Sequence, residues 1–119
     1  MVFILWWIPF VLYNFLIFYL SSLSKISGSE KVPDEISHFF EFGLLSILFF
    51  LGWTQGFKEK IRKEHVFLII FFSFLIAISD EVHQIFVPGR IFSLKDLSFD
   101  LLGILFFSIL IYFKLKKSK

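Results

Sequence analysis

The sequence predicts an all-α integral membrane protein, folded as a single domain (1–119) in a bundle of four transmembrane helices with both termini cytoplasmic. The chain is 57% hydrophobic and contains 20 phenylalanines among its 119 residues, and its mean hydropathy is +0.82. A soluble domain of this size has too little interior to bury so many large apolar side chains. The spacing of the apolar segments and the distribution of Lys and Arg specify the spans and their orientation.

Four apolar segments are long enough to cross a bilayer, whose hydrocarbon core of about 30 Å requires about 20 helical residues. They lie at about 2–20, 37–54, 66–86 and 97–113. The first segment carries no charge and lacks both the basic n-region and the small-residue cleavage site of a signal peptide, so it is predicted to be a span. Each connecting segment is short and contains Gly, or Gly and Pro, which favour the end of a helix.

Orientation follows from the positive charges, which are enriched in cytoplasmic loops. An even number of spans places the N-terminus, the second loop and the C-terminus on one face. The positive residues of that face are Lys58, Lys60, Arg62, Lys63, Lys114, Lys116, Lys117 and Lys119, and those of the opposite face are Lys25, Lys31, Arg90 and Lys95. The richer face is predicted to be cytoplasmic. Trp6, Trp7 and Trp53 fall at the same boundary, as an aromatic belt would.

Composition also excludes several classes of function. The net charge of +2 is small and spread over several loops, so nucleic acid is not a predicted partner. The chain has no cysteine, which excludes disulfides, thiolate metal sites and cysteine nucleophiles.

Ionisable residues of three spans fall at similar depth near the outer face. Counting at 1.5 Å per residue, Asp80 to Gln84 lie about 21–27 Å from the cytoplasmic end of their helix, and Asp100 and Asp96 lie about 20 and 26 Å up theirs. His38 and Glu41 lie about 3–8 Å below the outer surface. A charge facing lipid costs about 2–3 kcal/mol or more, so these side chains should face one another. The sequence predicts a polar cavity between the last three spans, open to the outer face.

The residues of this region resemble a known family. The stretches "DEISHFFEF" (34–42) and "SDEVHQIFVPGRIFSLKDLSFDLLG" (79–103) are similar to the VanZ-like family of small bacterial membrane proteins. The matching positions are Asp34, His38, Phe39, Glu41, Ser79, Asp80, Glu81, Gln84, Phe86, Pro88, Arg90, Ser93, Asp96, Asp100 and Gly103. Glu35 stands where Lys is usual and Phe42 where Tyr is usual. The resemblance implies an association with low-level teicoplanin resistance and specifies no reaction.

The predicted ligand-binding residues line the cavity: Asp34, His38, Glu41, Asp80, Glu81, Gln84, Arg90, Asp96 and Asp100. Arg90 follows the Pro88–Gly89 turn, and its guanidinium suits a phosphate or carboxylate. The expected ligand is therefore an anionic membrane lipid or a cell-wall precursor. An internal salt bridge from Arg90 to Asp80, Glu81 or Asp96 is an equal alternative.

Two other classes of function stay open. Asp80, Glu81 and Asp96 are candidates for general acid–base catalysis in an intramembrane enzyme. No cofactor is predicted, although His38, Glu41, Asp80 and His83 form two carboxylate–imidazole pairs at i,i+3 spacing that could hold a divalent metal. The chain could also be an accessory subunit of a membrane complex, for which the sequence identifies no protein partner.

Overall fold

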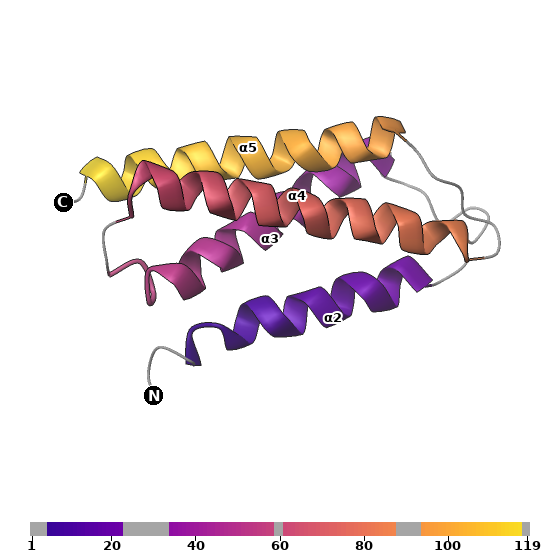
Figure 1. Ribbon diagram of the computed structural model, residues 1–119, viewed down its shortest axis with the longest axis horizontal. Coiled ribbons are helices and arrows are strands. Elements are labelled where there is room, and N and C mark those ends of the chain that lie inside the picture. Colours follow the sequence, from indigo (N-terminus) through magenta and orange to yellow (C-terminus); the bar gives the residue numbers. More distant parts are fainter. Residues whose placement is uncertain (1–4, 23–33, 59–60, 88–93, 118–119) are drawn as a thin grey trace.

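The computed structural model describes residues 5–22, 34–58, 61–87 and 94–117, and these segments consist of helices with turns at their ends and contain no strand. The four helices are α2 (Ile8–Ser22), α3 (Asp34–Trp53), α4 (Lys63–Ile85) and α5 (Leu94–Lys117), shown in Figure 1. The prediction of an all-α fold with four helices is confirmed.

Three helices are long and apolar enough to cross a membrane, over Ile36–Trp53, Lys63–Ile85 and Leu94–Lys116. The apolar part of α2, Ile8–Leu20, is shorter than a usual span. The sequence predicted a first span over 2–20, but Trp6 and Trp7 form a turn and α2 begins at Ile8. Pro9 gives the physical reason, because proline has no N–H to donate and is tolerated only in the first turn of a helix.

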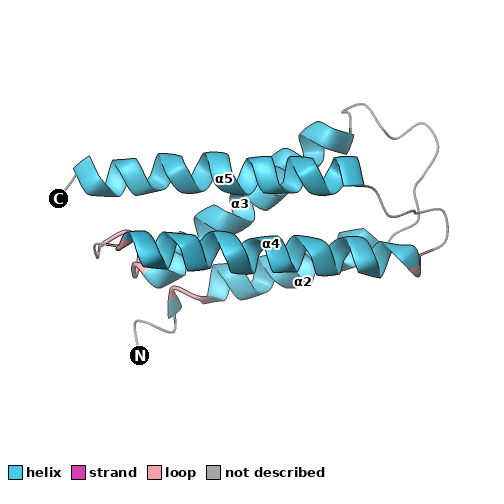
Figure 2. Ribbon diagram, turned by 45° about the horizontal axis from the view of Figure 1, so that its top comes forward, coloured by secondary structure: helices cyan, strands magenta, loops and turns pink. Residues whose placement is uncertain are grey.

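Successive helices run in opposite directions, so the start of α2 and the end of α5 lie at the same end of the bundle (Figure 1). Figure 2 shows α3 crossing behind α5 and α4, with α2 on the side away from α5. The largest interface is between α3 and α5. It includes Gly43 and Gly103: a Cβ atom at Gly103 would clash with the backbone carbonyl of Phe39, and one at Gly43 would meet the ring of Phe107. Small residues of this kind let two membrane helices approach closely.

Tryptophans mark the end of the bundle where α2 begins and α3 finishes. The Trp7 ring packs against Gly52, and the Trp6 ring against Gly56, which adopts a φ of +79° in the turn after α3. The Lys58 ammonium lies 5.6 Å from the centre of the Trp6 ring, a cation–π distance. This end therefore combines aromatic rings with basic side chains, as interfaces between membrane and water do.

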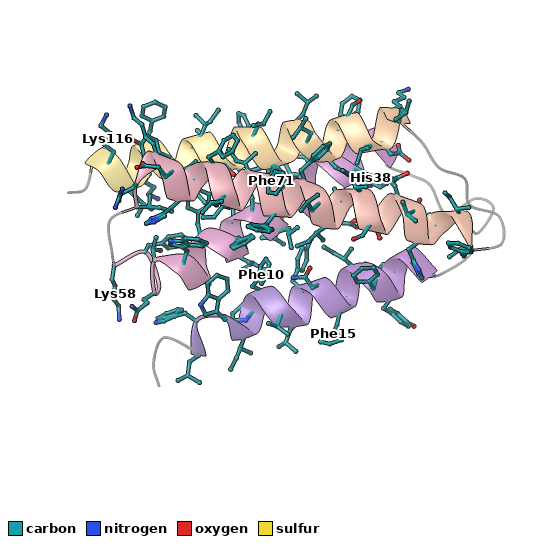
Figure 3. The ribbon with its side chains drawn as sticks, in the orientation of Figure 1. Phe10, Phe15, His38, Lys58, Phe71 and Lys116 are labelled. Carbon is teal, nitrogen blue, oxygen red and sulfur yellow. The ribbon has the colours of Figure 1, made fainter. Side chains whose placement is uncertain are left out.

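Large apolar side chains cover the outside of all four helices. Phe15 of α2 is 70% exposed, and Phe71 of α4 is 48% exposed (Figure 3). The interior instead contains small or polar residues beside its Phe, Leu and Ile side chains, among them Ser46, Ser73 and Ser108. An apolar exterior around a partly polar interior is the distribution expected of a protein surrounded by lipid.

Candidate functional site

Ionisable side chains from three helices meet at the end of the bundle where α3 and α5 begin and α4 finishes. Figure 3 shows His38 near this end and Lys116 near the other. Asp80, Glu81 and Asp100 are buried with at most 1% exposure, and His38 is 9% exposed. Because α4 runs antiparallel to α3 and α5, the first turns of two helices and the last turns of the third lie at one level.

The centre of the site is His38, which links α3 to α5. Its Nδ1 atom lies 2.7 Å from Oδ1 of Asp100, and its Nε2 atom lies 3.6 Å from Oδ2 of Asp96. Asp96 and Asp100 are one helical turn apart on α5, so they lie on the same face. The imidazole is therefore held between two carboxylates of one helix, one at each ring nitrogen.

Glu81 brings α4 into the same group. Potential ligand atoms of His38, Glu81 and Asp100 all lie within 4.8 Å of one another, and all three residues are buried. We refer to these three residues as the buried triad. It offers one imidazole nitrogen and two carboxylate groups, each from a different helix.

Other predicted site residues surround the triad. On α4, Gln84 is 4% exposed and Asp80 is 1% exposed. On α3, Glu41 is half-buried, and its backbone carbonyl accepts a hydrogen bond of 2.8 Å from the Tyr13 hydroxyl of α2. That bond ties α2 to the part of α3 that carries the site.

His83 lies apart from the triad. Its ring makes an edge-to-face contact with Phe18 of α2, with ring centres 5.7 Å apart. The sequence had paired it with Asp80, and His38 with Glu41, as metal candidates, whereas the structure groups His38 with Glu81 and Asp100. No sequence signal shows how far α4 is rotated about its axis, so the sequence could not show that Glu81 lies beside His38 and Asp100.

Comparison with protein families matches residues 3–115 to the family described as VanZ/LLP1. The chain belongs to the VanZ/LLP1 family. This result confirms the resemblance identified from residues 34–42 and 79–103. The VanZ/LLP1 match includes α2, α3, α4 and nearly all of α5, and with them the whole buried triad. Comparisons with curated proteins and with solved structures give no match.

Two predicted ligand residues of this VanZ/LLP1 protein cannot be placed in the site. Arg90 and the turn residues Pro88 and Gly89 lie outside the described residues. Asp34 is the first residue of α3, and the position of its side chain is not described. The described part of the site is therefore acidic around a single imidazole.

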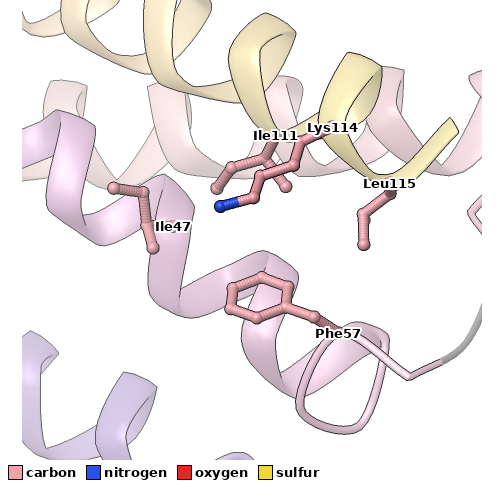
Figure 4. A pocket seen from close by; sticks show the side chains of 5 residues that line it. All are labelled: Ile47, Phe57, Ile111, Lys114 and Leu115. Carbon is pink, nitrogen blue, oxygen red and sulfur yellow. The ribbon is translucent and has the colours of Figure 1, made fainter. Parts of the chain in front are cut away.

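A separate cavity lies at the opposite end of this VanZ/LLP1 bundle. It has a volume of about 350 Å³ and is lined by Ile47, Phe57, Ile111, Lys114 and Leu115 (Figure 4). Its lining is apolar except for the Lys114 side chain, whose ammonium group lies among the lining residues in Figure 4. None of the predicted site residues contributes to this cavity.

Proposed function

We propose that this VanZ/LLP1 protein is a multi-pass protein of the bacterial cytoplasmic membrane whose polar site binds an anionic envelope component and contributes to teicoplanin resistance. The ligand class is a lipid headgroup or a lipid-linked cell-wall precursor. The observation that carries the proposal is the burial of Asp80, Glu81 and Asp100 beside His38 at one end of a membrane bundle. Ionisable groups inside membrane helices are costly and are typical of functional sites.

The location of the site supports an envelope ligand. The opposite end of the bundle carries the basic side chains of the second loop and of the C-terminal helix, including Lys58, Arg62, Lys63, Lys114 and Lys116. By the positive-inside rule that end is cytoplasmic, so the site opens toward the outer surface of the membrane. A headgroup in the outer leaflet, or a lipid-linked precursor exposed there, would reach the site from that surface.

An anionic ligand needs a positive group in the site, because the described carboxylates would repel it. Arg90 is the sequence candidate, since it follows the end of α4 by a few residues and offers a planar fork of donors to phosphate or carboxylate. The acids would then orient the Arg90 guanidinium, and they would hold the ligand through it.

A second candidate function is an intramembrane enzyme that uses acid–base chemistry. The contact of 2.7 Å between His38 and Asp100 favours it, because a carboxylate beside one ring nitrogen fixes the tautomer and orientation of an imidazole. Asp80, Glu81 and Asp96 would be the additional acids or bases. Hydrolysis or transfer on a lipid headgroup would fit such a site.

The experiment is a deletion strain tested for teicoplanin susceptibility and complemented with single variants. Wild type should restore resistance, whereas Arg90→Ala, Asp96→Ala and His38→Gln should not, at equal protein level in the membrane. His83→Gln is the matched control, because this second membrane histidine packs against Phe18 and is not a member of the triad. Full complementation by all three site variants would rule out the proposed role of the site. Unchanged susceptibility in the deletion strain would rule out the role in teicoplanin resistance.

A further inference from the structure

The residues of the buried triad come from three helices and are far apart in sequence, yet their ligand atoms converge within 4.8 Å. His38, Glu81 and Asp100 supply one nitrogen and two carboxylates. Three protein ligands with one coordination position left open are typical of catalytic zinc sites, some of which combine His with Glu. Imidazole favours zinc and its neighbours over magnesium or calcium, which prefer sites made entirely of oxygen ligands.

Asp100 gives an independent indication of a bound cation. Its side chain has an exposed fraction of 0%. Oδ1 lies against His38, and Oδ2 has no hydrogen-bond partner among the described residues. A buried carboxylate oxygen without a partner is costly in a helix bundle within a membrane. A metal ion at the triad could coordinate such an oxygen.

The carboxylates beside the His38 ring also fit a histidine that binds a metal. A histidine that binds a metal through one ring nitrogen almost always donates the other N–H to a carboxylate or a carbonyl. In this site Nδ1 of His38 faces Asp100, and Nε2 lies 3.6 Å from Oδ2 of Asp96. With Nδ1 as the ligand atom, Asp96 occupies the position of the orienting carboxylate.

Charge favours a divalent ion in the same place. Two ionised carboxylates and a neutral imidazole carry a formal charge of −2, which a single divalent cation neutralises. Two carboxylates that lie close together in a low-dielectric interior repel each other, and a divalent cation between them would offset that repulsion. The side chains next to the triad are not fully enclosed by the described residues, since those of His38 and Asp96 are 11% and 16% exposed.

We propose that His38, Glu81 and Asp100 form a binding site for a divalent transition-metal ion of the zinc class, with Asp96 orienting the imidazole. This inference goes beyond the proposed function. Where the proposed function also holds, the open coordination position gives the ion a place to contact a phosphate of the envelope ligand.

The test uses the full chain, purified in mild detergent with a tag that contains no histidine and then treated with a chelator. Co²⁺ serves as the spectroscopic probe, and Zn²⁺ and Mg²⁺ serve as competitors. Wild type should bind one Co²⁺ with visible absorption bands, Zn²⁺ should displace it, and Mg²⁺ should not. The thermal unfolding midpoint should rise with Zn²⁺, because the ion binds the folded state.

Four variants separate this site from other metal-binding residues. His38→Gln and Glu81→Gln should each weaken binding by at least about 100-fold, since each removes a ligand. Asp96→Asn should weaken it about 10- to 100-fold and keep the absorption bands, as expected of an orienting residue. His83→Gln should bind as wild type does.

The proposal is overturned if monodisperse wild type gives no Co²⁺ spectrum, or if His38→Gln binds with the affinity of wild type. The wild-type titration does not depend on the folding of any variant. It is also independent of teicoplanin susceptibility. Metal binding without a resistance phenotype would support the metal site and refute the proposed function. A resistance phenotype without metal binding would refute the metal site alone.

Discussion

His38 and Asp100, which are 62 residues apart in sequence, contact each other at 2.7 Å across the α3–α5 interface. Asp100 is fully buried, and Asp96 lies on the other side of the same imidazole. The contact therefore joins the start of one membrane helix to the start of another, at the end of the bundle that carries the candidate site. It contributes both to helix packing and to the geometry of the site.

The first prediction concerns the coupling between these two residues. His38→Ala and Asp100→Ala should each lower the free energy of unfolding by about 3–5 kcal/mol, because each leaves a buried partner uncompensated. The free energy of unfolding of the double variant should fall by about 1–3 kcal/mol less than the summed losses of the two single variants. Denaturant unfolding of the purified protein in mixed micelles, with metal chelated, measures the cycle. If the losses of the two single variants add up to that of the double variant, the contact does not form in the folded protein.

The level of a residue along the bundle could be predicted from the sequence, and the rotation of each helix about its axis could not. The rise of an α-helix is fixed, so counting residues was enough to bring His38, Glu81 and Asp100 to one level. Rotation about the helix axis depends on packing against neighbours. The structure turns α4 so that Glu81 faces Asp100 while His83 contacts Phe18 of α2. For the same reason, the sequence identified the acids without identifying which of them surround the imidazole.

The beginning of the first helix shows a different limit. Residues 2 to 20 form one uninterrupted apolar segment, so hydropathy alone does not indicate where in it the helix begins. The turn at Trp6 and Trp7 depends on Pro9 and on the packing of both indoles against Gly52 and Gly56. Those contacts are between segments distant in sequence, and hydropathy does not report them.

The second prediction concerns the close approach of α3 and α5. Gly103→Ala should lower the free energy of unfolding by about 1–3 kcal/mol, because the added methyl meets the Phe39 carbonyl, a backbone atom that cannot rotate away. Gly43→Ala is the matched comparison. It should lower the free energy of unfolding by less than Gly103→Ala does, since its methyl meets the Phe107 ring, which can turn. Denaturant titration in micelles measures both. Equal stability of Gly103→Ala and wild type would mean that the helices are farther apart than described.

The third prediction concerns buried serines. The hydroxyls of Ser73 and Ser108 are fully buried and have no hydrogen-bond partner among the described residues. Ser73→Ala and Ser108→Ala should therefore be neutral, or stabilise the protein by up to about 1 kcal/mol, because each removes an unsatisfied polar group. Ser46→Ala should instead cost about 0.5–1 kcal/mol, since the Ser46 hydroxyl donates a hydrogen bond of 2.7 Å to the Gly43 carbonyl. The same unfolding assay compares the three variants, and a loss of more than about 1 kcal/mol at Ser73 would contradict the prediction.

The fourth prediction concerns orientation, on which the proposed outward opening of the site depends. The chain has no cysteine, so single cysteines can be introduced without background. Lys58→Cys lies before α4 and Lys95→Cys lies in the first turn of α5, so α4 separates them. A membrane-impermeant thiol reagent added to intact cells should label Lys95→Cys, and it should label Lys58→Cys only after permeabilisation. Labelling of Lys58→Cys but not of Lys95→Cys in intact cells would place the polar site on the cytoplasmic side. Labelling of both variants in intact cells would show that α4 does not cross the membrane.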